Sequence, residues 1–216
     1  MDLSEFEFDL PEHLIALRPA DPQDSARLLV VHGDGRLEDA TVRDLPRYLS
    51  AGDVMVFNDT RVLPAALTGV RPARDESGQD VACDVNLTER MDARRWRALA
   101  RPGRRLKESD TIIFAEGFSA EITGRHEGGE IELCFSLAGD ELTDALDAHG
   151  AMPLPPYIAR RRPADALDRE TYQTRFAGED AASVAAPTAG LHFTPRLLAD
   201  IDAAGIVRET VRLHVG

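Results

Sequence analysis

The sequence has 216 residues, of which 43% are hydrophobic and 29% charged, with a formal net charge of −13 at pH 7. This composition is typical of a soluble globular protein with a substantial core, and the charge as a whole disfavours a nucleic-acid partner. No apolar run reaches membrane-spanning length, and the acidic start MDLSEFEFDL lacks the pattern of a signal peptide. A cytoplasmic protein is therefore expected.

The cysteines and histidines give no metal-ligand pattern. Cys83 and Cys134 lie far apart, without a CxxC pair or a histidine at ligand spacing, so free thiols are expected. The six histidines include no HExxH pair, and no P-loop is present. Residues 32–39, HGDGRLED, have Glu38 where a dinucleotide-binding motif needs a third glycine, and they predict a hairpin turn.

The first elements in the chain are short. Residues 8–19 predict one or two helical turns entered through Pro11, and residues 26–31 predict a strand. Residues 42–52 predict a short helix that ends at Gly52.

Residues 53–67, DVMVFNDTRVLPAAL, predict a strand that leads into a site. The apolar run at 54–57 is typical of a strand covered on both faces. Four polar side chains follow it directly: Asn58, Asp59, Thr60 and Arg61. Because ligands of open α/β sheets bind beyond the carboxyl ends of strands, this position indicates a functional site. A plain turn is the alternative.

From about residue 67 to 137 the pattern changes to short β-like runs at close spacing. Such spacing predicts a small antiparallel barrel or sandwich that interrupts the surrounding α/β pattern. The runs are 96–100, 111–114, 118–123 and 130–135. We therefore expect a main domain with a mixed sheet and helices, made of residues 1–66 and 138–216, and an inserted β domain at 67–137.

Arginines are clustered in two places. Eight basic residues lie between positions 90 and 107, opposed only by Asp92, and three arginines occupy 160–162. An acidic chain that keeps its arginines together can use them to bind phosphates. The alternative is a solvated basic face that balances acidic neighbours.

Residues 139–150 predict a helix with Gly150 at its C-terminus. The four prolines of residues 152–163 predict an extended, stiff segment that holds Tyr157 in place. A fixed tyrosine followed by arginines suits stacking on a base, whereas a simple linker is the alternative.

Residues 183–194, SVAAPTAGLHFT, are small, apolar and poor in charge. They predict a buried loop that wraps a small molecule, or else a tight strand-to-helix connection. Thr194 and Pro195 predict the start of a helix that ends at Gly205, with a strand over 207–215 behind it. His192 would then lie just before a helix N-terminus, which favours anionic groups.

Six segments in this order resemble the S-adenosylmethionine:tRNA ribosyltransferase-isomerases of queuosine biosynthesis. They are FNDTRVLPAAL, RPGRRL, MPLPPYI, DRETYQTRFA, SVAAPTAGLHFT and LHVG, and the likeness runs from Phe8 to Gly216. Two departures stand out: GQDVACDVNLTER is more polar than the family's strand there, and family members continue past LHVG. A natural short form or a fragment is therefore expected.

The resemblance implies a main α/β domain with an inserted β-barrel. It also implies an enzyme that transfers and isomerises the ribosyl part of S-adenosylmethionine onto 7-aminomethyl-7-deazaguanine at the tRNA wobble position. Adenine and methionine leave, and the product is epoxyqueuosine. No metal and no cofactor beyond the co-substrate S-adenosylmethionine is expected, and we expect a monomer without a membrane partner.

Such chemistry needs a base near the sulfonium carbon and an acid near the departing adenine. Among Asp59, His192 and His214, histidine titrates in the useful range without help, so His192 is the expected acid/base, a helix-capping role being its alternative. Asp59 would need a raised pKa, which Arg61 opposes, and it is expected to position the substrate. Arg61 is expected to hold the methionine carboxylate.

The remaining expected site residues divide by partner. The substrate-binding set adds Asn58, Thr60, Tyr157, Pro187, Thr188, Ala189, Gly190 and His214. The expected tRNA contacts are Arg94, Arg95, Arg104, Arg105, Arg160 and Arg161. Two other functions stay open: a non-catalytic module that binds tRNA or an adenosyl ligand, and an adenosyl-dependent transferase with another acceptor.

Overall fold

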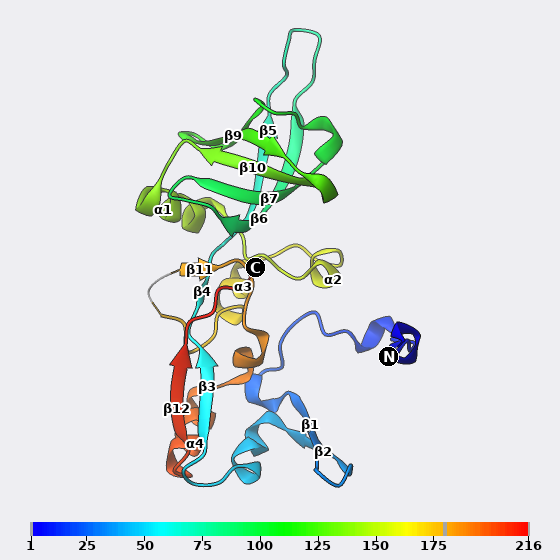
Figure 1. Cartoon of the computed structure of the whole chain (residues 1–216), viewed down its shortest axis with the longest axis vertical. Helices are drawn as coiled ribbons and strands as arrows, with labels where there is room; N and C mark the ends of the chain where they lie inside the picture. The colour runs from blue at the N-terminus through cyan, green and yellow to red at the C-terminus, as the bar shows by residue number, and fades with distance from the viewer. Residues whose placement is uncertain (1, 179–180, 216) are drawn as a thin grey trace.

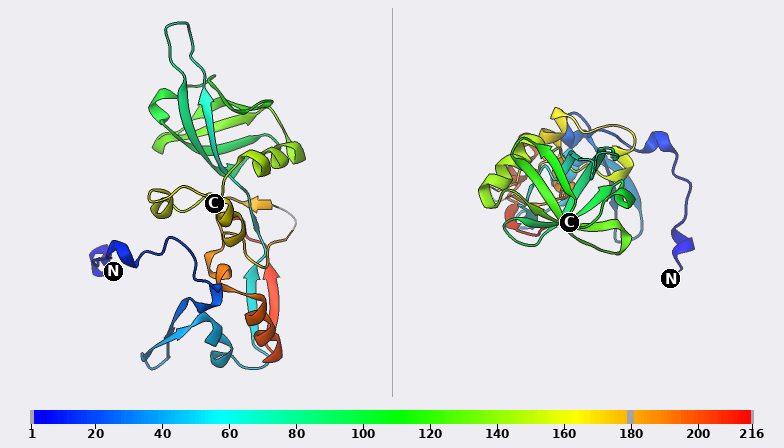
Figure 2. Two further views of the ribbon diagram at one scale, coloured as in Figure 1. Left: turned by 180° about the vertical axis from the view of Figure 1, so that it is seen from behind. Right: turned by 90° about the horizontal axis from the view of Figure 1, so that it is seen from above.

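The computed structural model describes residues 2–178 and 181–215 of the chain. It is elongated, with a β-barrel at one end of the long axis and the N- and C-terminal elements along the rest of it (Figures 1 and 2). Both views show the chain crossing between these parts near residues 62–66 and again after α1 (Gly139–His149). The barrel thus interrupts a mixed α and β arrangement, as the sequence predicted.

Six antiparallel strands close the barrel in the order β10-β7-β6-β5-β8-β9. They are β5 (Ala66–Arg71), β6 (Val81–Arg90), β7 (Arg95–Arg101), β8 (Thr111–Ala115), β9 (Phe118–Arg125) and β10 (Glu130–Phe135). Every second side chain of β6, from Val81 to Leu87, is buried inside the barrel, as the two-residue period of a strand requires. Leu142 and Leu146 of α1 join the same core, so this helix packs on the barrel.

The strands outside the barrel form three separate pairs. β1 (Arg27–Val31) and β2 (Leu37–Thr41) make an antiparallel hairpin, which confirms the turn predicted at 32–39. β3 (Val54–Asn58) pairs in parallel with β12 (Val207–Val211), and β4 (Arg61–Val62) pairs in parallel with β11 (Ala181–Ser183).

Helix α4 (Pro195–Ala203) connects the last part of the chain back to β3. Thr194 caps it by accepting a hydrogen bond from the Leu197 amide, and Gly205 follows with a φ of 75°, so both predicted ends are confirmed. Leu197 and Ile201 on its inner face pack with Phe57 in the second core.

The remaining helical segments are short. Two are α-helical, α2 (Pro156–Ala159) and α3 (Ala166–Thr171). The 3-10 turns are η1 (Leu3–Phe6), η2 (Glu12–Leu14), η3 (Gln23–Ser25), η4 (Val42–Tyr48), η5 (Gly103–Arg105), η6 (Glu127–Gly129) and η7 (Thr188–His192). No helix in the described ranges is long and apolar enough to cross a membrane. Both cysteines are free thiols, as expected.

Three sequence-based expectations are wrong in detail. Val54 and Val56 are 57% and 59% exposed, so the strand is not covered on both faces; only Met55 and Phe57 turn toward the core. The segment 152–163 is not extended throughout, because Pro155 and Pro156 sit at the N-cap and first position of α2, where proline is compatible with a helix. The helix expected at 42–52 is the 3-10 turn η4, which contains Pro46 and therefore lacks one amide donor.

Candidate functional site

The four polar residues after β3 face different neighbours. Asn58 is held by the backbone of Leu213: its Nδ2 donates to the carbonyl at 2.8 Å, and its Oδ1 accepts from the amide at 3.2 Å. The same Oδ1 accepts from the Thr60 amide at 3.0 Å. Asn58 thus fixes the turn against the segment that follows β12.

Asp59 is paired with Arg212. The Nε and Nη2 atoms of the guanidinium donate to the two carboxylate oxygens, each at 3.0 Å. This hydrogen bonding lowers the pKa of Asp59 below its ordinary value. Asp59 is therefore a carboxylate at neutral pH, which fits a positioning role better than proton transfer. The arginine that lowers the pKa is Arg212 and not Arg61.

Thr60 and Ser183 form the buried link between the two polar segments. Both residues have no exposed surface, and their hydroxyl oxygens are 2.7 Å apart. The Ser183 hydroxyl also accepts from the Val215 amide at 2.8 Å. This serine therefore joins the turn after β3, the end of β11 and the segment after β12 at one point.

Arg61 points to the barrel side of the turn. Its Nη2 lies 3.5 Å from Asp147 of α1, and both side chains are about two-fifths exposed (40% and 39%). A single long contact of this kind is weak in water. Arg61 can therefore exchange Asp147 for a ligand carboxylate at little cost.

The segment 188–194 packs on β3 through aromatic rings. Phe57 stacks on Phe176 with centroids 3.9 Å apart, and Phe193 meets Phe57 edge-on at 5.0 Å. Gly190 lies against Thr174, where an added Cβ would come within 3.0 Å. Small residues here are thus explained by close packing.

The expectation of a buried loop at 183–194 is confirmed for Ser183 and Ala186 but is wrong for the turn that follows them. Thr188 and Ala189 are exposed, and none of the η7 residues is buried. A single 3-10 turn has too few side chains to cover itself; from this turn and the residue after it, Leu191 and Phe193 pack against core residues. The segment is closer to the tight connection that was its alternative.

The two candidate histidines lie in different surroundings. His192 is half-buried in η7, and among the described residues no hydrogen bond reaches its ring. His214 is exposed and lines a cavity of about 330 Å³ between the barrel and the segments around Ser183 and Val215. This junction cavity is lined by Thr88, Glu89, Arg90, Trp96, Val184, His214 and Val215.

Trp96 is the only tryptophan of the chain and lies at the start of β7. It is 2% exposed, and its Nε1 is buried without a hydrogen-bond partner among the described residues. The Arg90 guanidinium lies 5.9 Å from its ring centroid. The junction cavity therefore combines a histidine, an arginine and a tryptophan. The sequence analysis selected only the histidine as a substrate-binding residue.

The basic stretch 90–107 is divided between the two ends of β7. Arg94 and Arg95 lie at the end near the junction cavity, and Arg95 is paired with Asp92 at 2.6 Å. Arg104 and Arg105 are exposed in η5 at the opposite end. A seven-residue strand separates the pairs by about 20 Å, so they cannot contact one phosphate.

Two arginines of the second cluster, 160–162, make contacts within the protein. Arg160 is exposed on α2 beside Tyr157, which is 53% exposed. Arg161 pairs with Glu12 at 3.2 Å, and Arg162 makes two hydrogen bonds, of 2.6 and 2.7 Å, to the buried Asp168.

Two residues outside the expected set are central to this geometry. Ser183 is the first residue of the predicted loop at 183–194, but a serine beside small apolar residues gives no sequence signal of its own. Arg212 lies 153 positions from Asp59, and only the parallel register of β3 with β12 brings them together. In the part of the chain that the structure describes, no group of three His, Cys, Asp or Glu side chains could hold a metal ion.

Residues 3–216 match the family model of the queuosine biosynthesis proteins. The chain belongs to this family. Relatives named S-adenosylmethionine:tRNA ribosyltransferase-isomerase are 78% identical in Hyphomonas neptunium and 54% identical in Maricaulis maris, each over the whole of this chain. The chain spans 62% and 61% of their lengths. The crystal structure of the Thermotoga maritima S-adenosylmethionine tRNA ribosyltransferase is 29% identical, with a TM-score of 0.38, covering 98% of this chain and 58% of that one. The chain thus matches about three-fifths of the length of these two relatives.

Proposed function

We propose that this chain binds S-adenosylmethionine and tRNA, and that it takes part in moving the ribosyl group onto 7-aminomethyl-7-deazaguanine at the wobble position. One structural observation supports the proposal in addition to the family match. The segments with the family's motifs, 58–61, 183–184 and 213–215, are distant in sequence but meet at the foot of the barrel beside the junction cavity.

The junction cavity is the proposed place of the reacting groups. A positively charged sulfonium and an adenine both suit an aromatic wall, which Trp96 supplies. The indole N–H of Trp96, which has no partner in the described part of the chain, offers a donor to a ligand acceptor atom. Arg61, only loosely held by Asp147, is the proposed partner of the methionine carboxylate.

The geometry favours His214 over His192 as the group that moves a proton, because only His214 lines the junction cavity. His192 is the second candidate for proton transfer, because its half-buried ring lies next to the N-terminus of α4. Asp59 acts as a fixed carboxylate that holds Arg212 and accepts from ribose hydroxyls. Adenine and methionine leave, and the modified base of the tRNA carries the transferred group with its epoxide. The overall reaction balances without a metal or an oxidant.

The experiment uses the 216-residue chain with S-adenosylmethionine and tRNA that carries the aminomethyl base, and it measures released adenine and the modified nucleoside by mass spectrometry. His214→Ala is expected to lower adenine release by about 10²–10⁴-fold, and His192→Ala by less. Release that needs the aminomethyl base supports the proposal. Release with unmodified tRNA indicates a transferase with another acceptor, and binding without release indicates the non-catalytic module.

A further inference from the structure

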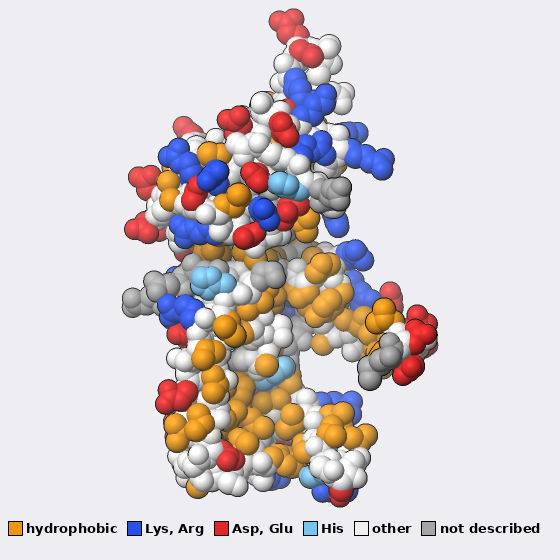
Figure 3. Space-filling model, viewed as in Figure 1, with side chains coloured by type: hydrophobic (Ala, Val, Ile, Leu, Met, Phe, Trp, Pro, Cys, Tyr) orange, Lys and Arg blue, Asp and Glu red, His pale blue; other side chains and the backbone are white. Residues whose placement is uncertain are grey.

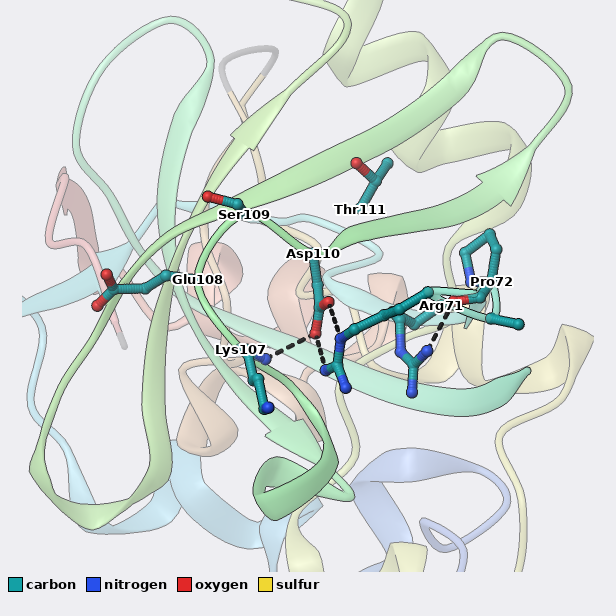
Figure 4. Close-up of a pocket in the computed structure, with 9 residues that line it drawn as sticks. Arg71, Pro72, Lys107, Glu108, Ser109, Asp110 and Thr111 are labelled. Atoms are coloured by element: carbon teal, nitrogen blue, oxygen red, sulfur yellow. Dashed lines mark hydrogen bonds and ion pairs between the residues drawn. The ribbon is translucent and has the colours of Figure 1, made fainter. Parts of the chain in front are cut away.

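The barrel carries a second, positively charged pocket at its far end. Residues 71–74, at the end of β5, and residues 107–111, in the turn before β8, enclose about 450 Å³ (Figure 4). Ala66, at the other end of β5, bridges to Ala151, so this distal pocket lies about 17 Å along the strand from the junction. It takes no part in the chemistry proposed above.

Arg71 is the unusual residue of the distal pocket. It is only 6% exposed, yet among the described residues no ion pair reaches its guanidinium. Nη1 donates to the Pro72 carbonyl at 2.7 Å, while Nε is buried with no hydrogen-bond partner in the ranges 2–178 and 181–215. A desolvated guanidinium without a hydrogen-bonded carboxylate is costly unless an anion supplies the missing acceptors.

A second guanidinium is held beside it by Asp110. Arg74 donates to the two oxygens of this carboxylate at 2.7 and 2.6 Å, and the Lys107 amide donates at 2.7 Å. The hydrogen bonds from Arg74 keep the pKa of Asp110 below its ordinary value, so the carboxylate stays charged and fixes the arginine. Asp110 is thus hydrogen-bonded to Arg74 and only close enough to Arg71 to attract it, so one carboxylate faces three cations: Arg71, Arg74 and Lys107.

Figure 4 shows the Arg71 and Lys107 side chains on the same side of Asp110, whereas Glu108 points away from them. Ser109, between the two charged residues of the turn, has a φ of 65°. A non-glycine residue in this region carries backbone strain, so contacts around it must hold the turn in place. The turn is fixed by the Ser109 amide, which donates to the Ile122 carbonyl at 2.8 Å.

The surroundings favour a polyanion over a small free anion. Exposed arginines continue outward from the pocket at positions 101, 104, 105 and 125. Figure 3 shows Lys and Arg side chains gathered on the barrel beside the β5–β6 hairpin. A chain of phosphates can follow such a surface, and only one phosphate needs to enter the pocket.

We propose that Arg71, Arg74 and Lys107 form a binding site for one backbone phosphate of the RNA substrate, distant from the modified base. The choice of RNA rests on the proposed function. The expectation that the pocket binds an anion does not depend on the proposed function, because it follows from the pocket's own arginines and lysine.

The sequence offers a direct probe, since Lys107 is its only lysine. An amine-reactive acetylating reagent can therefore modify only Lys107 and the α-amino group of Met1, which serves as internal reference. The rate of modification is measured by peptide mass spectrometry for the free chain, with inorganic phosphate, and with tRNA. We expect tRNA to slow modification of Lys107 at least tenfold relative to Met1, and millimolar phosphate to slow it less.

Ser109→Asp and Ser109→Asn form a matched pair of variants. Both side chains tolerate the left-handed backbone, and they differ only in charge. Protection by tRNA should persist in the Asn variant and be lost in the Asp variant. Arg71→Met should also lose it, whereas Arg196→Met, on exposed α4, should keep it.

A separate gel-shift titration with tRNA distinguishes the possible failures. A chain that binds tRNA while Lys107 keeps its full reactivity overturns the distal site and leaves the proposed function intact. Protection by phosphate but not by tRNA also overturns the RNA assignment. A chain that does not bind tRNA contradicts both proposals.

Discussion

Arg212 holds Asp59 with two hydrogen bonds of 3.0 Å, across 153 positions of sequence. The contact fixes the turn after β3 to the end of β12, and it sets the charge state of the one carboxylate in that turn. A carboxylate held in its charged form is a poor general acid, which agrees with the proposal that a histidine transfers the proton.

Replacing Arg212 by methionine should raise the pKa of Asp59 toward its ordinary value, because the hydrogen bonds that lower it are lost. A carbon-detected NMR titration of the carboxyl group measures this directly. Arg208→Met, which removes the neighbouring pair with Asp202, is the control and should leave Asp59 unchanged. An Asp59 pKa equal in wild type and Arg212→Met would contradict the assignment.

The buried hydroxyl pair gives a stability prediction. Ser183→Ala removes the partner of both Thr60 Oγ1 and the Val215 amide, and should lower the free energy of unfolding by about 2–3 kcal/mol. Thr60→Val leaves Ser183 bonded to Val215 and should cost less, about 1 kcal/mol. Urea denaturation followed by circular dichroism measures both. Equal costs would show that the Val215 contact contributes nothing.

Gly150 is required by close packing and not by its backbone angles. An added Cβ would lie 2.0 Å from the Pro64 carbonyl oxygen, where the chain returns from α1 past the entrance of the barrel. Gly150→Ala should therefore destabilise the fold by about 3 kcal/mol. Gly33→Ala is the control, since nothing lies within 4 Å of its added Cβ. Thermal unfolding of both variants compares them, and a neutral Gly150→Ala would contradict the packing.

Asp168 connects the N-terminal segment to α3. Its side chain is 3% exposed and pairs with Arg162 at 2.6 Å and Arg18 at 3.0 Å. Asp168→Asn leaves the largely buried Arg162 without its carboxylate, while Arg18 keeps Asp165, and should cost on the order of 3 kcal/mol at pH 7.

The hydrogen bonds from Arg162 lower the pKa of Asp168 in the folded protein. Its contribution to stability is therefore complete above the ordinary carboxyl pKa of about 4 and is lost as pH falls through the lower folded value. Denaturation at several pH values should show the difference between wild type and Asp168→Asn shrinking below about pH 4. A difference that is constant from pH 7 to pH 3 would indicate a purely steric effect.

Local patterns predicted the elements well where one face of each is buried. The predicted β runs that became β7 to β10, the caps of α4 and the hairpin at 32–39 all follow from short-range rules. The apolar run of β3 was misleading, because Val54 and Val56 look like core residues but face outward beside a single neighbouring strand. Hydrophobicity shows that a face can be buried, not that another element covers it.

The site was less predictable because its contacts join distant strands. Neighbours in sequence suggested Arg61 as the partner of Asp59, yet Arg61 faces Asp147 and Arg212 comes from β12's end. The basic run looked like one patch, but β7 carries its two halves to opposite ends of the barrel. Only the register of the sheets determines such pairings.

The central claim, that the junction cavity receives S-adenosylmethionine, is tested most directly by its single tryptophan. A ¹⁵N-labelled chain has one indole N–H, that of Trp96, and its NMR cross-peak reports on the cavity wall. Titration with S-adenosylmethionine should shift this peak saturably, with the same midpoint as the heat of binding. Binding heat without any movement of the Trp96 peak, or no binding at all, would contradict the account.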